Sequence, residues 1–292
     1  MPVVLNEKKQ AEYIIEKGEV GNKPTSTLFL LAKYYRQKEN LNKEQTFNKL
    51  NEFMEKNYKN YNSATWEDII EDISKKANKY PLREIDHIEI TKSEIDTIRN
   101  VCNIKYEKLL FTMLCYAKLY NKISDKNNGW VNTDIKELFR VARVSVRYRN
   151  DKFLYLNDLE TAGLISFSNK NDNLNLRVTF IDDDSETILR VDDFRELGYE
   201  YLNYIGEGNF THCQLCGKIF KKRSNNDVYC RECADNVKYY EPIETKKIVC
   251  VDCGKEIEIE STSRKIRCDE CFKKERSRIN ANYRKKTSSF KS

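Results

Sequence analysis

Eight of the ten cysteines fall into four pairs with the spacing Cys-x-x-Cys. Such a turn presents two thiolates to one ion, and zinc prefers four soft ligands at the corners of a tetrahedron. The 13 and 14 residues between successive pairs are long enough to fold back and bring two pairs together. The spacing therefore predicts two zinc ions. Their ligands are Cys213, Cys216, Cys230 and Cys233 at the first site, and Cys250, Cys253, Cys268 and Cys271 at the second.

Four cysteines close the coordination shell of zinc, so both sites are predicted to be structural; a catalytic zinc keeps an open position. Two redox dithiol pairs are the alternative, but they call for a surrounding βαβ pattern that the sequence lacks. His212, beside Cys213, is an alternative ligand, although a complete set of four cysteines does not need it. The other two cysteines, Cys102 and Cys115, lie on apolar helical faces and are expected to be buried core thiols.

The residues around the cysteines predict how each module folds. Gly217 and Gly254 each follow the second cysteine of a first pair, where the turn often needs a positive φ. The segments Lys218–Phe220 and Glu256–Glu260 predict strands of hairpins that lie between the two pairs of each site. A helix is expected after the last cysteine of each set, and its macrodipole favours a thiolate at its start.

The cysteine motifs resemble the zinc-ribbon and treble-clef-like modules of bacterial and phage DNA-binding proteins. The first match is Cys-Gln-Leu-Cys-Gly-Lys-Ile-Phe at 213–220 with Tyr-Cys-Arg-Glu-Cys at 229–233. The second is Cys-Val-Asp-Cys-Gly-Lys at 250–255 with Arg-Cys-Asp-Glu-Cys-Phe-Lys-Lys at 267–274. The resemblance covers about residues 211–286 and implies structural zinc. It leaves the ligand open, because such modules also bind RNA and proteins.

The positive charge of the chain is concentrated at its C-terminal end. Residues 272–292 carry a net charge of +7, whereas the whole chain carries +6. Such a segment predicts an anionic partner, most often nucleic acid, and a solvated tail is the alternative. At helical pitch Phe272, Ile279 and Tyr283 are expected on one side, near the zinc module. The candidate nucleic-acid contacts are Lys273, Lys274, Arg276, Arg278, Arg284, Lys285 and Lys286.

Residues 1–90 predict a helical bundle. One helix runs from a cap at Asn6 towards Gly18, one follows Pro24, and one begins at a cap at Ser63. The segment 21–32 resembles the helical domains appended to plasmid and phage primases. The apolar positions expected to face the core are Leu28, Leu31, Ala32 and Tyr35; Phe47, Leu50, Phe53 and Met54; and Trp66, Ile69, Ile70 and Ile73.

Residues 91–182 predict a helix, a strand, a helix, a turn, a helix and a hairpin, after a capping box at Thr91–Glu94. This order, with the phrase Leu-Asn-Asp-Leu-Glu-Thr-Ala-Gly-Leu-Ile at 156–165, resembles a winged helix over about residues 104–181. The expected elements are a helix through 109–116, a strand at 130–131, a helix capped by Asn132 or Thr133, a helix through 153–159 closed by Gly163, and strands at 164–167 and 174–180 joined by a turn at 169–173.

The winged-helix resemblance implies that the second helix of the motif enters the major groove of DNA. Arg147, Arg149, Asn150 and Lys152 are then expected in the N-terminal half of that helix, where they suit phosphate, guanine or adenine. The alternatives are an ordinary helix face whose cations offset nearby acids, and a protein-docking domain.

The remaining segments complete the organisation. A connecting helix is expected within 183–208, the first zinc module at 209–240, and the second with its basic tail helix at 246–286. The fold class is therefore α+β, mainly α: helical bundle, winged helix and two small zinc modules. Asp182–Asp184 predicts an acidic loop, with a metal-dependent nuclease as the alternative.

The sequence predicts a non-enzymatic, zinc-containing protein that binds nucleic acid, with duplex DNA favoured. It has no P-loop, no dinucleotide fingerprint and no His-Glu-x-x-His motif. No apolar run has the length of a signal peptide or a membrane span, so a cytoplasmic location is expected. The resemblances imply a phage or mobile-element protein acting in replication or transcriptional control. The rival hypothesis is an inhibitor or adaptor whose zinc modules grip a protein partner.

Overall fold

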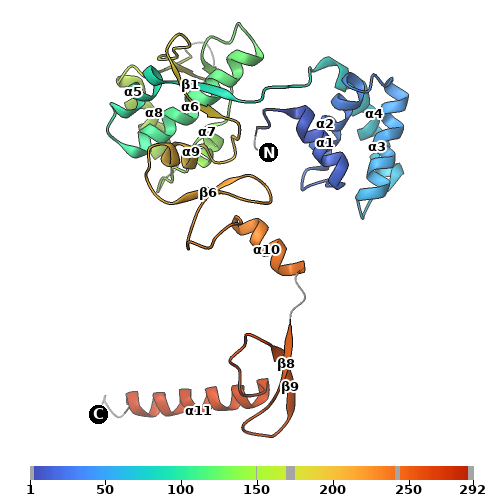
Figure 1. The fold of residues 1–292 in the computed structure, drawn as a ribbon, viewed down its shortest axis with the longest axis vertical. Coiled ribbons are helices and arrows are strands. Elements are labelled where there is room, and N and C mark those ends of the chain that lie inside the picture. Colours follow the sequence, from blue (N-terminus) through green and yellow to red (C-terminus); the bar gives the residue numbers. More distant parts are fainter. Residues whose placement is uncertain (1–2, 149, 169–174, 241–243, 289–292) are drawn as a thin grey trace. The chain divides into compact units, whose positions relative to one another are not determined.

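The computed structural model describes residues 3–148, 150–168, 175–240 and 244–288 (Figure 1). The fold is α+β, with about 49% helix and small antiparallel sheets of two or three strands. The fold class predicted from the sequence is therefore confirmed as α+β. The chain divides into two compact units, residues 1–230 and 231–292. In the described part of the chain, no helix is both long and apolar enough to span a membrane.

Four helices enclose the first hydrophobic core. Asn6 caps the first helix as predicted, and Gly18 ends it with a φ of +68°. The cap of the fourth helix is Asn62 rather than Ser63, and Ile69 is 38% exposed instead of facing the core. The elements are α1 (Glu7–Lys17), α2 (Pro24–Gln37), α3 (Lys43–Asn57), α4 (Ser63–Lys76) and the 3-10 turn η1 (Ala77–Lys79).

A second core gathers around the long helix α6 (Ile104–Ile123), whose residues 109–119 are nearly all fully buried. Its central sheet has the antiparallel order β2-β4-β3. Asp134 caps α7, in place of the expected Asn132 or Thr133. The other elements are α5 (Lys92–Arg99), β2 (Trp130–Val131), α7 (Ile135–Val141), α8 (Asp151–Thr161), β3 (Ile165–Phe167), β4 (Leu176–Val178) and α9 (Leu197–Tyr204). The predicted turn at 169–173 lies outside the described residues.

A strand pair that was not predicted from the sequence belongs to this core. β1 (Ile88–Thr91) pairs antiparallel with β5 (Thr187–Val191), almost a hundred residues later. Ile88 and Ile90 are fully buried, so β1 contributes apolar side chains to the core. The expected connecting segment 183–208 thus holds a strand as well as helix α9.

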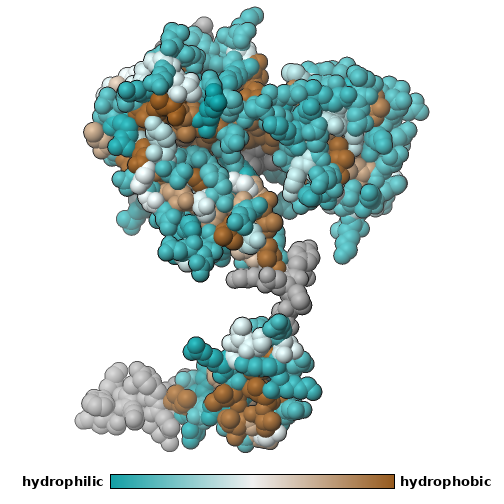
Figure 2. Space-filling view, in the orientation of Figure 1, coloured by the Kyte–Doolittle hydropathy of each residue, from teal (hydrophilic) through white to brown (hydrophobic). Residues whose placement is uncertain are grey.

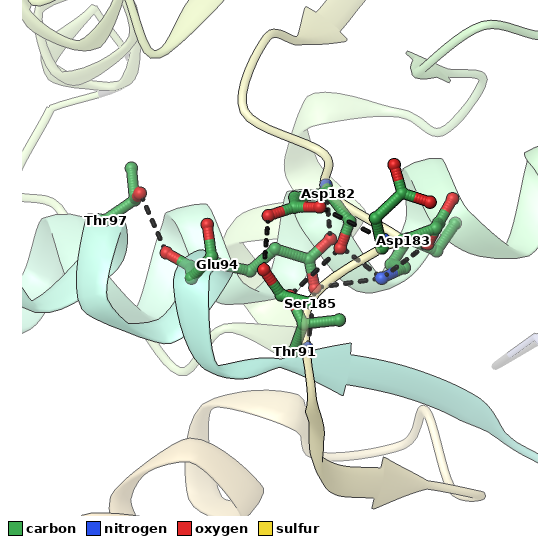
Figure 3. A network of polar contacts seen from close by, with 9 residues as sticks. Thr91, Glu94, Thr97, Asp182, Asp183 and Ser185 are labelled. Atoms are coloured by element: carbon green, nitrogen blue, oxygen red, sulfur yellow. Dashed lines mark hydrogen bonds and ion pairs between the residues drawn. The ribbon is translucent and has the colours of Figure 1, made fainter.

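A buried ionic network fastens the loop before β5 to helices α5 and α6 (Figure 3). The Glu94 side chain is fully buried, and Lys118 donates to both of its oxygens at 2.7 and 2.9 Å. The amides of Thr91 and Asp182 donate to the same carboxylate at 2.8 and 3.0 Å. Asp183 also pairs with Lys118, at 2.8 Å. Hydrogen bonds from a lysine and two backbone amides therefore stabilise one buried charge.

The smaller elements follow in two hairpins and two helices. The first hairpin consists of β6 (Phe210–His212) and β7 (Ile219–Lys221) and belongs to the first unit. The second unit begins with α10 (Arg231–Tyr240) and continues with β8 (Thr245–Val249), β9 (Glu256–Glu260) and α11 (Asp269–Ser288). Figure 2 shows apolar side chains on the surface of this unit. Its residues Val249, Val251 and Ile266 are more than half exposed.

Candidate metal centres

The eight cysteines form the two predicted groups of four. Within each group all four Sγ atoms lie within 4.8 Å of one another. The Sγ atoms of Cys216 and Cys230 are 3.8 Å apart, and so are those of Cys253 and Cys268. A tetrahedral zinc with Zn–S bonds of ~2.3 Å requires edges of about 3.8 Å. A disulfide requires about 2.05 Å, and none of the described cysteines forms one. The spacing of the thiols therefore fits one zinc-sized ion per group.

In the first group, the pair Cys213 and Cys216 forms the tip of the β6–β7 hairpin. His212 pairs with Ile219 across the strands, and the Cys213 amide donates to the Lys218 carbonyl at 3.0 Å. Gly217 donates back to the Cys213 carbonyl at 2.8 Å with a φ of +70°, as the sequence predicted. The hairpin thus encloses the first pair. The sequence had predicted a hairpin between the two pairs, and this prediction is wrong.

The second group repeats this arrangement with the hairpin β8–β9. Here the Cys250 amide donates to the Lys255 carbonyl, and Gly254, with a φ of +69°, donates to the Cys250 carbonyl, both at 2.9 Å. Val249 and Glu256 are the last paired residues before the turn. The two modules therefore share one local fold, although their cysteines are the main feature their sequences have in common.

The second pair of each group lies at the start of a helix. Cys230 precedes α10 and Cys233 is in its first turn, and Cys268 and Cys271 hold the same positions at α11. Both helices begin one turn earlier than expected from the sequence. Backbone N–H groups at a helix N-terminus favour negative charge, so this placement stabilises thiolates.

Hydrogen bonds to sulfur shift the pKa values of individual thiols. Burial acts to raise the pKa of Cys213, but backbone N–H groups of Cys216 and Cys230 outweigh it and lower the pKa to about 6. The Cys268 amide, 3.3 Å from the sulfur, is the main cause that lowers the pKa of Cys250 to about 6. Thiol neighbours raise the pKa of Cys271 to about 12. The hydrogen bonds thus favour one thiolate in each group, at Cys213 in the first and at Cys250 in the second.

The other histidine and cysteine candidates lie outside these groups. His212 is exposed, and its Nε2 is 3.4 Å from the Glu200 carboxylate, so it makes a hydrogen-bond contact beside the first group. Cys115 is fully buried, as expected. Cys102 contradicts the expectation, because it is exposed in the turn between α5 and α6 with a φ of +53°.

The residues expected to read DNA are not all on the predicted helix. Arg147 and Asn150 are exposed but precede α8, which begins at Asp151, and Arg149 lies outside the described residues. Lys152 is in the first turn of α8, with its Nζ 5.2 Å from the centre of the Phe139 ring. The turn before α8 therefore carries more of these side chains than the helix itself.

The basic tail is helical as predicted, but it does not pack as expected. Phe272 and Ile279 of α11 are 52% and 56% exposed, so they do not cover the zinc module. Lys273, Lys274 and Arg276 are exposed, and Arg278 pairs with Glu275 at 2.9 Å. The last candidates, Arg284, Lys285 and Lys286, also belong to α11, and their side chains lie outside the described part of the chain.

The acidic run is an ordered loop with structural partners. Asp182 accepts hydrogen bonds from the Ser185 hydroxyl at 2.6 Å and the Asp184 amide at 3.1 Å. These bonds, the hydroxyl first, lower the pKa of Asp182. Asp183 pairs with Lys118 as described above. The loop is thus positioned by its own hydrogen bonds and by the Glu94 network (Figure 3).

Each group can hold one metal ion through a hairpin tip and a helix start, and soft thiolate donors select metals such as zinc. Comparisons of the chain with protein-family models, with curated proteins and with solved structures return no match. Function is therefore inferred from the geometry and chemistry of the chain itself.

Proposed function

We propose that this chain is a structural-zinc protein that binds nucleic acid, with duplex DNA as the favoured ligand. The zinc assignment is supported by the thiol separations of 3.8 Å and by four soft donors in each group. The role of each ion is to hold a hairpin to a helix, because four cysteines leave no open position for a substrate. Phage or mobile-element replication or transcriptional control is the setting that the sequence resemblances favour.

Helix α11 is the observation that carries the nucleic-acid assignment. It continues directly from the second cysteine group, and its described positions 272–274 and 276–281 are all exposed. Among the described residues, no carboxylate lies within 4.0 Å of the charged groups of Lys273, Lys274 or Arg276. Unpaired cations on one projecting helix release counterions when they meet phosphates.

We also propose that residues 104–178 form a winged helix. The order α6, β2, α7, α8, β3, β4 and the sheet order β2-β4-β3 support this topology. The outward positions of α8 are nevertheless poor in cations: Leu154, Asn157, Asp158 and Thr161 are among the residues there. The cations Arg147 and Lys152 lie at its start. We therefore assign any DNA contact of this region to the turn before α8.

Charge reversal on α11 tests the nucleic-acid proposal. The triple variant Lys273→Glu, Lys274→Glu, Arg276→Glu should weaken binding to duplex DNA of any sequence, because phosphate contacts carry affinity rather than specificity. The slope of log affinity against log salt should become shallower by roughly 0.9 for each phosphate that the helix no longer neutralises. Fluorescence anisotropy titrations with duplex DNA, single-stranded DNA and RNA at two salt concentrations measure both effects.

A matched control separates local contacts from net charge. The variant Lys59→Glu, Lys75→Glu, Lys79→Glu changes the same number of exposed charges on the surface of the N-terminal helical region. It should leave the salt slope unchanged, because the proposal assigns the phosphate contacts to α11. Equal effects of the two triple variants, or no binding of the parent to any of the three nucleic acids, would overturn the proposal.

Protein interaction is the second candidate function, and the exposed face of α8 favours it. Leu154 is 63% exposed and Phe153 41% exposed on a helix that also presents Asp158. Apolar side chains beside an acid suit a protein partner better than phosphates. If Leu154→Ser abolishes a protein contact while the α11 variant binds DNA like the parent, this second function is the correct one.

A further inference from the structure

Arg195 attaches the β6–β7 hairpin, which carries Cys213 and Cys216, to the helical part of the first unit. Its Nη2 donates a hydrogen bond of 2.7 Å to the carbonyl oxygen of Cys216. Asp193 holds the guanidinium in place, because its carboxylate oxygens accept from Nε at 2.8 and 2.9 Å. The two side chains are 33% and 18% exposed, so water screens the pair only partly. The backbone of a metal-ligand residue is thereby fixed by a side chain from outside the module.

Helix α9, which follows Arg195, contacts the same hairpin through its side chains. The Tyr199 ring lies 5.0 Å from the ring of Phe210 in β6, centre to centre. Glu200 lies 3.4 Å from the Nε2 of His212, the residue before Cys213. The hairpin is therefore held to Arg195 and α9 at three points: one hydrogen bond to its backbone, one ring contact and one contact between Glu200 and His212.

Helix α9 also contacts the turn that leads from α7 to α8. A Cβ on Gly198 would lie 2.0 Å from the Ala142 carbonyl oxygen, so the two backbones are in direct contact. Arg143, with a φ of +52°, pairs with Glu196, and its guanidinium lies 5.0 Å from the centre of the Tyr199 ring. Tyr199 thus contacts both the turn and the hairpin.

The second cysteine group has no comparable attachment among the described residues. A Cβ on Gly217 would meet Arg195 at 3.8 Å, whereas one on Gly254, at the same place in the second hairpin, meets nothing within 4 Å. The ion pair beside this hairpin joins Asp252 to Arg267 at 2.7 Å, and both residues belong to the module itself. Cys253 is exposed, whereas its counterpart Cys216 is partly buried.

We propose that Arg195 is a positioning residue of the first metal site, and that metal binding there stabilises α9 and the turn at 142–146. The second site stabilises its own module alone. A ligand that binds only the folded arrangement stabilises whatever must be ordered to form it. Arg195 and Tyr199 extend that set of ordered groups from the first site to the turn at 142–146. This inference rests on the proposed zinc. A chain without zinc and a chain whose zinc release does not depend on Arg195 are separate experimental outcomes.

The rate of zinc release tests the positioning role. We mix the full chain with an excess of the chromophoric chelator 4-(2-pyridylazo)resorcinol and expect two phases, with the second site releasing first. Outer contacts of metal ligands typically change metal affinity by roughly 10–100-fold. Arg195→Ala should accelerate the slow phase by a factor in that range and leave the fast phase unchanged. Arg195→Lys keeps the positive charge but lacks the planar guanidinium group, so it should give an intermediate rate.

Arg267→Ala is the matched control, because it removes an arginine contact beside the other hairpin. It should leave the slow phase unchanged. A slow phase equal in the parent and in Arg195→Ala, or accelerated equally by Arg267→Ala, would overturn the positioning role. Protein that contains no zinc from the start would instead overturn the proposed function.

Hydrogen exchange followed by mass spectrometry tests the coupling to the turn. The Val144 amide, bonded to the Phe139 carbonyl at 3.0 Å, reports on the turn. Arg195→Ala and Cys216→Ser should each speed exchange in peptides that cover 142–146 and 197–204. Cys253→Ser should leave these peptides unchanged. Equal protection in all three variants and the parent would show that the first site does not stabilise the turn.

Discussion

Removal of the buried charge of Glu94 is the most informative change in the second core. Glu94 accepts four hydrogen bonds of 2.7–3.0 Å, and its partner Lys118 is itself only 7% exposed. Loss of one member of such a buried pair costs about 3–5 kcal/mol, because the other charge is left without its partner. Asp183 still contacts Lys118, so Glu94→Gln should lie near the lower end, at about 3 kcal/mol.

Urea unfolding measures this loss. The chain has two tryptophans, and Trp130 lies in strand β2 of the second core, whereas Trp66 lies in α4. Fluorescence in a Trp66→Phe background therefore reports on the second core alone. The midpoint should fall while the urea dependence stays the same, which marks a change in stability rather than in the surface exposed on unfolding.

Two further variants complete this test. Asp183 is 69% exposed, so Asp183→Asn should cost at most about 1 kcal/mol. The double variant Glu94→Gln, Lys118→Met removes both charges, so no lysine charge is left buried without Glu94. It should therefore be more stable than Glu94→Gln alone. If Glu94→Gln costs no more than Asp183→Asn, the network is not what fastens the loop before β5.

Two more predictions concern packing and pH. Gly198→Ala places a Cβ 2.0 Å from the Ala142 carbonyl oxygen, so it should lower the free energy of unfolding of the second core by about 1–3 kcal/mol in the same urea assay. An unchanged midpoint would mean that α9 is not packed directly on this turn. The thiols of Cys268 and Cys253 raise the pKa of Cys271 to about 12, so zinc must displace its proton at neutral pH. Affinity at the second site should therefore rise with pH, by about tenfold per unit for each displaced proton, in competition titrations between about pH 6 and about pH 9. Affinity independent of pH would contradict the assignment of Cys271 as a ligand.

Local sequence signals predicted the elements whose determinants are close together along the chain. The Asn6 cap, the capping box of Thr91 with Glu94 and the positive φ of Gly217 each depend on residues within about four positions. The cysteine groups were also predictable, because each Cys-x-x-Cys pair is itself local and zinc chemistry requires two such pairs.

The features that were missed depend on contacts between distant segments. The β1–β5 pair joins residues about a hundred positions apart, and the alternation Ile88-Glu89-Ile90 of β1 is too short to predict a strand by itself. The hairpins enclose the first cysteine pairs because the strands Phe210–His212 and Thr245–Val249 come before the motifs, where no strand was expected. No sequence motif predicts the contact of Arg195 with the Cys216 carbonyl, because nothing in the sequence distinguishes Arg195 from the other arginines.

Metal stoichiometry decides whether the two cysteine groups are zinc sites. Protein purified without chelators should contain two zinc ions per chain by elemental analysis and native mass spectrometry. Cys216→Ser and Cys253→Ser should each retain one ion, because each removes a ligand from a different group. The helical cores should stay folded in Cys253→Ser, as judged by the urea midpoint. Two ions in both variants would contradict the ligand assignment, and parent protein without zinc would contradict both sites.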